Sequence, residues 1–346
     1  MQAARPSIFY IDLLRFIAAI AVVSIHVLGP FRYLYGEIPD LEWLAAAGTN
    51  SVTRWAVPVF MMISGALLLS SNKVFEWRYY LTKRVSKVVI PFIAWTIIYA
   101  LVGGFMLDGI YSGDWQSDKA LDILINSPTE PVWYHLWFFY DFIPLYFVIP
   151  FLLPLLKQAT PDHIKLALAC WLVLLTMHWL KVGDVLQQNL VLYTGYLVSG
   201  WYLFNRDNRP QLKLWVIAGV AMLLLNFIGT WYLALEEGKY RSLFMGYKTL
   251  NTAVIAGMLF VLAQTYAERI QGKCRALVTL ISTYSLGIYL IHPLWLIPIR
   301  NLSNGYYDLF MTNWIAIPML TIIALVLSLF STMLLVKIPL LKRLVP

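Results

Sequence analysis

Apolar runs, each about 20 residues long, recur along the whole 346-residue chain. A helix of that length is about 30 Å long, which matches the hydrocarbon thickness of a bilayer. We therefore expect an all-α, polytopic membrane protein that forms a single domain over residues 1–346 and carries no soluble appended domain. The pattern predicts ten transmembrane helices, at residues 8–29, 52–70, 88–107, 136–156, 164–180, 185–204, 214–234, 249–267, 276–298 and 314–336.

The composition excludes most other classes of protein. Apolar residues make up 60% of the chain and charged residues only 13%, about half of what a globular surface needs. Soluble enzymes, disordered tails and fibrous proteins are therefore excluded. The net charge of +8 falls in short clusters between the apolar runs, so it indicates topology and no nucleic-acid partner. Cys170 and Cys274 form neither a disulfide framework nor a metal-ligand pattern, and we expect no metal.

The distribution of Lys and Arg predicts the orientation in the membrane. With both termini in the cytoplasm, 17 of the 26 Lys and Arg residues lie on the inner side and eight on the outer side. This bias follows the positive-inside rule. Aromatic residues gather near the outer ends of the predicted spans, as in an interfacial belt that needs no ligand. They are Tyr33, Tyr35, Trp43, Trp115, Trp133, Tyr134 and Trp137.

The first apolar run, about 22 residues long, contains Asp12, Arg15 and His26. A cleaved signal sequence has a shorter run without charges, so we expect a retained helix. Arg15 and His26 are eleven residues apart, which puts them on one helix face about 16 Å apart along the axis. Asp12 and Arg15 can pair at a spacing of three. Ionisable groups inside a span are functional candidates because they cost free energy in lipid. Interfacial anchoring and an ordinary interhelical hydrogen bond are the alternative readings.

Two further motifs lie in and after the second run. Pro58 is expected to break the helix, and Ser64–Gly65 to let two backbones approach closely. After this run, Lys83, Arg84 and Lys87 have the spacings of one helix face and predict a cationic patch at the inner surface. Such a patch binds either lipid headgroups or a polyanionic ligand such as a nucleotide phosphate.

Two more histidines lie near the outer ends of predicted spans. His135 opens the fourth span among aromatic residues, which suit either a sugar ring or the lipid interface. In the ninth span, Ser285, Tyr289 and His292 follow one another at intervals of four and three. These intervals put the three side chains on one polar stripe of an apolar helix.

These motifs together resemble the acyltransferase 3 family, integral membrane O-acyltransferases that modify bacterial surface polysaccharides. The closest similarity is to the stand-alone enterobacterial-type O-acetyltransferases. The matching features run in order from residue 10 to residue 293. They are Arg15-x10-His26, F-M-M-I-S-G at 60–65, R-x-x-K at 84–87 where the family often has R-x-x-R, H-L-W-F-F at 135–139 and S-L-G-I-Y-L-I-H-P at 285–293.

The resemblance implies transfer of an acyl group, usually acetyl, from cytoplasmic acyl-CoA to a sugar hydroxyl on the far side of the bacterial inner membrane. His26 would be the general base, Arg15 would position the donor, and His135 and His292 would compete with His26 for its role. Lys83, Arg84, Lys87 and Ser64 would bind the donor. Expected partners are acyl-CoA, a glycan acceptor and membrane lipids. Direct transfer and an acyl-histidine relay both stay open, and a proton-coupled transporter or flippase of glycan intermediates is the alternative function.

Overall fold

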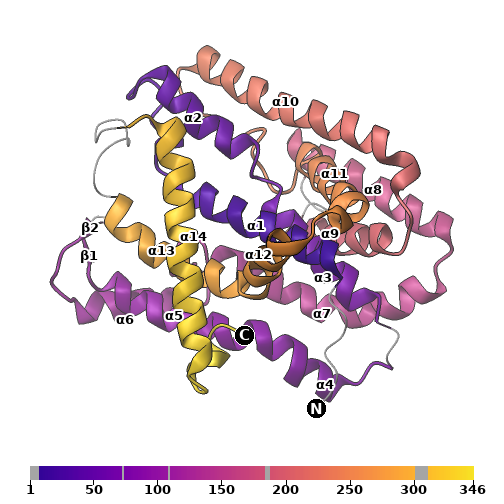
Figure 1. Ribbon diagram of the computed structural model, residues 1–346, viewed down its shortest axis with the longest axis horizontal. Helices are drawn as coiled ribbons and strands as arrows, with labels where there is room; N and C mark the ends of the chain where they lie inside the picture. The colour runs from indigo at the N-terminus through magenta and orange to yellow at the C-terminus, as the bar shows by residue number, and fades with distance from the viewer. Residues whose placement is uncertain (1–7, 72–73, 108–109, 184–187, 301–310) are drawn as a thin grey trace.

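The computed structural model describes residues 8–71, 74–107, 110–183, 188–300 and 311–346 (Figure 1). The predicted all-α class is confirmed, since the only strands in these ranges are β1 (Met106–Leu107) and β2 (Ile110–Tyr111), which pair antiparallel. The helices are α1 (Phe9–Val27), α2 (Asp40–Ser51), α3 (Ala56–Leu69), α4 (Trp77–Tyr80), α5 (Ser86–Gly103), α6 (Ser117–Asn126), α7 (Trp137–Gln158), α8 (Pro161–Trp179), α9 (Asn189–Phe204), α10 (Leu212–Glu237), α11 (Leu250–Tyr266), α12 (Gly272–Thr283), α13 (Ser285–Arg300) and α14 (Asn313–Lys337).

Short helical turns complete this order. A π-helical turn, Leu81–Val85, joins α4 to α5. Single 3₁₀ turns lie at Phe31–Tyr33, Arg209–Gln211, Ala267–Arg269 and Leu341–Arg343.

The helices support a multi-pass membrane protein but do not confirm ten spans. Seven segments are long and apolar enough to cross a bilayer, and the bent pair α12–α13 would make an eighth. The predicted fifth and sixth spans correspond to α8 and α9, which are not among them. α9 has only 16 residues, and α8 carries Asp162 and Lys165 near its start. The seven segments are Phe9–Val27, Asp40–Leu69, Trp77–Gly103, Trp137–Gln158, Arg209–Glu237, Leu250–Arg269 and Asn313–Lys337.

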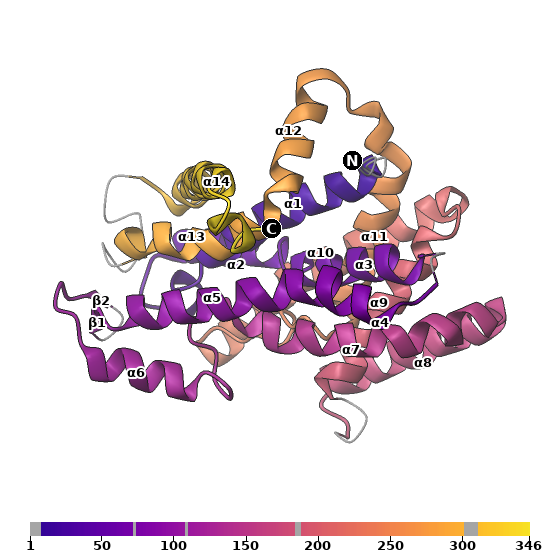
Figure 2. The same ribbon diagram turned by 90° about the horizontal axis from the view of Figure 1, so that it is seen from below.

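Two local predictions about helix continuity are wrong. Pro58 does not break a helix, because it lies in the first turn of α3, where its missing N–H group has no helical partner to lose. The single helix predicted at 276–298 is instead bent by 74° between α12 and α13. At this bend Thr283 Oγ1 donates to the Thr279 carbonyl at 2.7 Å, a contact that often bends helices. Figure 2 shows α12 running steeply to α13, beside α1.

α3 and α9 cross in direct backbone contact near the centre of the molecule. A Cβ atom on Gly65 would lie 1.9 Å from the Leu197 carbonyl oxygen, and one on Gly200 would lie 2.0 Å from that of Met62. The predicted close approach at Gly65 is therefore confirmed, and glycine is required on both helices.

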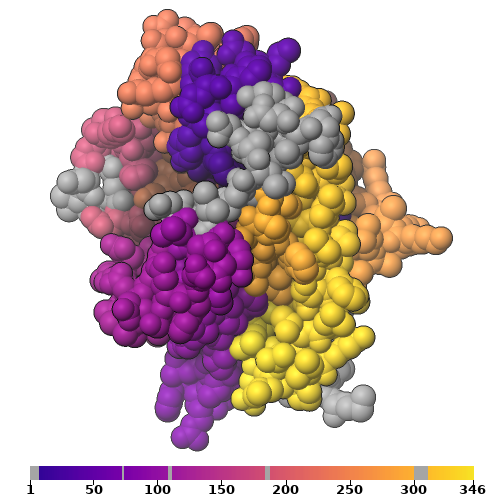
Figure 3. Space-filling model, turned by 90° about the vertical axis from the view of Figure 1, so that its left-hand side faces the viewer, coloured from indigo at the N-terminus to yellow at the C-terminus, as the bar shows by residue number. Residues whose placement is uncertain are grey.

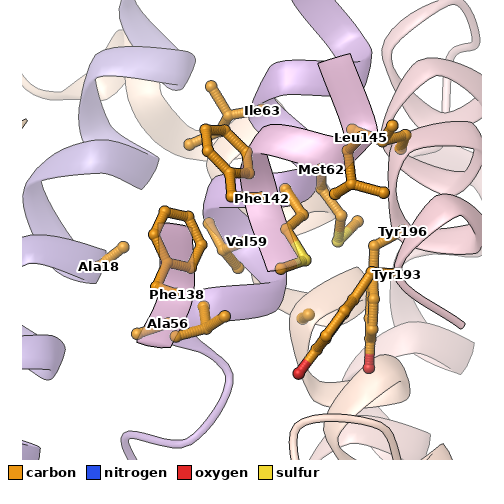
Figure 4. Close-up of a cluster of buried hydrophobic side chains, with 14 of the residues drawn as sticks. Ala18, Ala56, Val59, Met62, Ile63, Phe138, Phe142, Leu145, Tyr193 and Tyr196 are labelled. Atoms are coloured by element: carbon orange, nitrogen blue, oxygen red, sulfur yellow. The ribbon is translucent and has the colours of Figure 1, made fainter. Parts of the chain in front are cut away.

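The buried core surrounds this crossing and is formed mainly by α1, α3, α7, α9 and α11. In the α1 span 61% of the residues are buried, whereas in the span that contains α10 the share is 11%, as expected of a helix that faces lipid. Figure 4 shows side chains of α7 packed beside those of α1 and α3, with Tyr193 and Tyr196 of α9 nearby. The core thus holds α1, α3 and α7 in fixed positions, and α1 and α3 carry Arg15, His26 and Ser64 of the predicted site.

Candidate active site

Three histidines from three distant parts of the chain meet at one end of the bundle. His26 lies in the last turn of α1, His135 in the turn before α7, and His292 in the middle of α13. The ring centroid of His26 is 5.1 Å from that of His292 and 6.5 Å from that of His135. His135 and His292 are 5.6 Å apart. All three predicted histidines therefore form one cluster, which we call the histidine cluster.

The three rings differ in exposure. His135 and His292 are fully buried, whereas His26 is only partly buried. The His292 ring is held through its Nδ1 atom, 3.1 Å from the Ile288 carbonyl. Tyr289 donates its hydroxyl to the His135 carbonyl. His26 is thus the histidine that an incoming molecule can reach most directly, and its ring packs 5.0 Å from the exposed ring of Tyr134.

A central cavity of about 200 Å³ lies beside the cluster, between α1, α3, α5, α7 and α13. Its walls are mostly apolar, and Figure 4 shows three of the lining side chains, Ile63, Phe138 and Phe142. The Tyr289 ring lines this cavity and lies 5.3 Å from the ring of His135, so it connects the cavity wall to the histidine cluster. Arg15, Ser64 and the polar stripe of Ser285 and Tyr289, which were predicted from separate segments, therefore line one cavity. The polar residues that line it are Arg15, Ser64, Tyr146, Ser285 and Tyr289.

Arg15 is fixed on the cavity wall by its predicted ion pair. Its Nη1 atom lies 3.6 Å from the Asp12 carboxylate, and the same carboxylate oxygen accepts from Ser282 at 2.7 Å. A serine of α12 thus connects the Asp12–Arg15 pair to the bent helix. The Arg15 side chain remains 34% exposed, so its charge is available to a ligand in the cavity.

A second cavity, of about 170 Å³, lies farther from the histidines and is lined by Arg84, Glu76 and Tyr80 among others. We call this the Arg84 cavity and this end of the molecule the Arg84 end. The Tyr80 hydroxyl donates to the Tyr146 carbonyl at 2.7 Å. Since Tyr80 lines the Arg84 cavity and Tyr146 lines the central one, this pair separates the two spaces.

The predicted cationic patch is only partly brought together. Arg84 is half-buried and lines its cavity, but Lys83 and Lys87 are exposed and line none of the described cavities nearby. The prediction assumed α-helical periodicity, whereas Lys83 and Arg84 lie in a π-helical turn, which redirects side chains relative to the residues that follow.

A third cavity, of about 330 Å³, lies on the other side of the histidine cluster. We call it the Trp133 cavity and this end of the molecule the histidine end. Its walls come from the end of α5, from α6, from the turn before α7 and from α13. Figure 3 shows the surfaces of α6 and of the end of α13 side by side on this face. Pro293 and Tyr134 line this cavity, and each directly adjoins a histidine of the cluster in the sequence.

The site includes aromatic residues that the sequence analysis assigned elsewhere or overlooked. Trp133 and Tyr134 were read as interfacial residues, but both line the Trp133 cavity. Tyr99, which was not singled out, is fully buried with its ring 4.9 Å from His135. Trp43 is also not interfacial: it is fully buried, and its indole donates to the Arg32 carbonyl at 2.9 Å. In the sequence, the aromatic residues that flank His135 are the one signal for this aromatic part of the site.

Arg54 is a buried cation in the turn before α3. Its Nη1 atom donates to the Tyr247 hydroxyl at 2.9 Å, and the Tyr247 ring stacks on Trp137 at 5.2 Å. No salt bridge to Arg54 occurs among the described residues. Because Trp137 follows His135 by two residues, Arg54 supports the turn that carries this histidine.

The histidine cluster does not have the arrangement of a metal centre. Within the described ranges, no group of three or more His, Cys, Asp or Glu side chains is placed to hold a metal ion. Proton transfer by imidazole is what this arrangement offers, since the ordinary pKa of that ring lies near neutrality. The individual catalytic and donor-binding roles stay predictions.

Comparison with known families assigns the whole architecture to one group. The model of the acyltransferase 3 family, an acyltransferase domain, matches residues 8–333. Comparisons with curated proteins and with solved structures found no match. The family match covers the histidine cluster, the three cavities and nearly the whole chain. This protein therefore belongs to the acyltransferase 3 family of membrane acyltransferases.

Proposed function

We propose that this protein transfers an acyl group, most simply acetyl, from acyl-CoA in the cytoplasm to a hydroxyl of a surface or exopolysaccharide sugar, or of its lipid-linked precursor, on the outer side of the bacterial inner membrane. The main support for this proposal is the position of the histidine cluster between a cavity lined by a cation, Arg15, and a cavity with aromatic walls.

The Arg84 end is the donor side in this proposal. Arg84 and Arg15 lie on either side of the Tyr80–Tyr146 pair, so a polyanionic molecule meets positive charge at both points. The apolar walls of the central cavity suit an acyl chain and the thioester that carries it. Lys83 and Lys87 would add long-range attraction from the exposed surface. The bias of Lys and Arg supports a cytoplasmic Arg84 end and cytoplasmic termini.

The chemistry requires one proton transfer and one acyl transfer. His26 accepts the proton of the acceptor hydroxyl while the oxygen of this hydroxyl attacks the thioester carbonyl carbon. The tetrahedral intermediate then collapses with cleavage of the carbon–sulfur bond. The departing thiolate takes the proton from His26, which gives the O-acyl sugar and CoA with His26 restored. An acyl-histidine relay would divide the same transfer into two steps.

Consumption of acyl-CoA by the purified protein tests the function. We expect reconstituted protein to release free CoA thiol from acetyl-CoA in the presence of a sugar acceptor, and mass spectrometry to find one acetyl group on that sugar. A glycan transporter or flippase would move the sugar without consuming thioester. In this assay His26→Gln should lose activity. The His163→Gln variant is its matched control, because His163 is exposed on α8 and distant in sequence from the cluster.

The orientation is tested separately with reporter fusions. Fusions at residues 78 and 118 should report cytoplasmic and extracytoplasmic locations, respectively. An extracytoplasmic reporter at residue 78 would reverse the assignment of donor and acceptor ends, whatever the thioester assay shows.

A further inference from the structure

The Trp133 cavity contains a buried hydrogen-bond donor that has no acceptor within the described part of the chain. The indole N–H of Trp133 is inaccessible to solvent and donates to no acceptor among the described residues. Buried indole N–H groups normally have a partner, because leaving one unpaired costs free energy. The ring of Trp133 is held 5.1 Å from that of Tyr99, which in turn contacts His135. This donor is therefore fixed relative to the histidine cluster.

The size and walls of the cavity suit a small polyhydroxylated ring. Its volume of about 330 Å³ lies at the lower end of the roughly 300–1,000 Å³ typical of small-molecule sites. Trp133 and Tyr134 offer aromatic faces, on which the C–H face of a sugar packs. Tyr134 also contacts His26, so a ring seated beside it brings a hydroxyl toward the base.

The charge around this cavity disfavours an anionic occupant. Among the described residues Lys119 is the cation that lines it, and its ammonium group donates to the Met106 carbonyl. The surrounding segment, residues 110–134, is acidic, with four carboxylates against this one lysine. None of the four carboxylates lines the cavity, but their net negative charge opposes the approach of a carboxylate or phosphate to this segment. The acidic residues, all exposed, are Asp114, Asp118, Asp122 and Glu130.

From these observations we infer that the Trp133 cavity is the acceptor subsite and that it selects an uncharged sugar ring, whose oxygen accepts the Trp133 indole N–H. This inference rests on the proposed function and makes it more specific. The tryptophan orients the sugar, Tyr134 supports its apolar face, and the acidic segment 110–134 disfavours the approach of uronic acids.

Protection of an introduced cysteine tests binding without turnover. In a protein with Cys170 and Cys274 replaced by serine, Ile123→Cys places a thiol on the wall of this cavity. The probes are the methyl glycosides of glucose, galactose and N-acetylglucosamine, compared with methyl glucuronide and galacturonide. A neutral glycoside should slow labelling by a membrane-impermeant maleimide, while the uronides and CoA should not. Failure of every neutral probe to protect, or equal protection by the uronides, would overturn the inference.

Trp133→Phe tests the hydrogen bond, because it removes the N–H group and keeps an aromatic ring. The concentration of neutral glycoside that gives half-protection should rise about three- to tenfold, as expected for the loss of one neutral hydrogen bond. Trp115→Phe, on the exposed part of the same segment, should leave it unchanged. An unchanged value in Trp133→Phe contradicts the assigned donor. Because labelling needs no acyl transfer, protection without thioester consumption would reject the proposed function and retain the sugar site.

Discussion

The two ends of the cavity series are built in opposite ways. At the Arg84 end the cations are half-buried or exposed, and two of the three lie outside the cavities. At the histidine end, two of the three rings are fully buried and every ring contacts another aromatic side chain. Attraction of a polyanion acts over several ångströms and tolerates mobile side chains. Proton transfer requires donor and acceptor within hydrogen-bond reach, so it needs fixed rings.

This contrast predicts graded effects of substitution. Changes at the histidine end should act mainly on kcat, and changes at the Arg84 end mainly on the KM for the donor.

The largest effect is expected from His26→Gln. Removing a general base typically lowers the rate by about 10²–10⁴-fold, and we expect acyl transfer to fall by this factor while acyl-CoA still binds. The fold should persist, because one polar contact between membrane helices averages only about 0.6 kcal/mol. Steady-state transfer rates and a thermal unfolding assay measure the two quantities.

Glutamine variants of the other two histidines decide between the candidates. Since His135 and His292 are buried in packed surroundings, their replacement should lower stability as well as activity. Full transfer by His26→Gln, together with loss in His135→Gln or His292→Gln at normal stability, would move the base to the turn before α7 or to α13.

Arg84→Ala should raise the apparent KM for acyl-CoA with little change in kcat. A hydrogen bond to a charged group contributes about 1.5–3 kcal/mol, which corresponds to about 10- to 150-fold in affinity. The increase in KM should be smaller at high salt, because dissolved ions then screen the phosphates of CoA. Lys83→Ala is the matched control, because Lys83 precedes Arg84 in the sequence and its side chain is exposed. Equal donor KM values in the two variants would show that Arg84 only anchors the protein at the membrane surface.

Much of the site followed from helical periodicity alone. The eleven-residue spacing of Arg15 and His26 and the stripe of Ser285, Tyr289 and His292 are local relations along single helices. The structure keeps each set on one helix, even though α13 is shorter than predicted. The all-α class followed similarly from the apolar runs.

The remaining features depend on contacts between distant segments, which periodicity does not encode. The inward position of Arg84 depends on a π-helical turn. The roles of Trp133 and Tyr99 depend on how the turn before α7 meets α5 and α13, and the sequence offered only an aromatic cluster there. The bend between α12 and α13 separates two halves of one apolar run.

Tyr289→Phe should have a smaller effect than His26→Gln or Arg84→Ala. The change removes the hydroxyl that donates to the His135 carbonyl but keeps the ring that lines the central cavity. One neutral hydrogen bond contributes about 0.5–1.5 kcal/mol, so we expect kcat to fall about two- to tenfold. The KM for the donor should not change, since Tyr289 acts by positioning His135. Tyr284→Phe, at the α12–α13 bend, is the control, and a raised donor KM in Tyr289→Phe would instead indicate direct contact with acyl-CoA.

The smallest effect is expected from neutralising Lys83 and Lys87 together. Both side chains are exposed, and a charge in water contributes little to binding once salt screens it, with a Debye length of about 8 Å at physiological ionic strength. The Lys83→Gln, Lys87→Gln double variant should therefore raise the donor KM by about twofold or less at that salt concentration. At low salt the difference from the unmodified protein should grow, because attraction of CoA then acts over a longer distance. A salt-independent increase as large as that of Arg84→Ala would mean that both lysines contact the phosphates directly, and the Arg84 end would then be as closely fitted to its ligand as the histidine end.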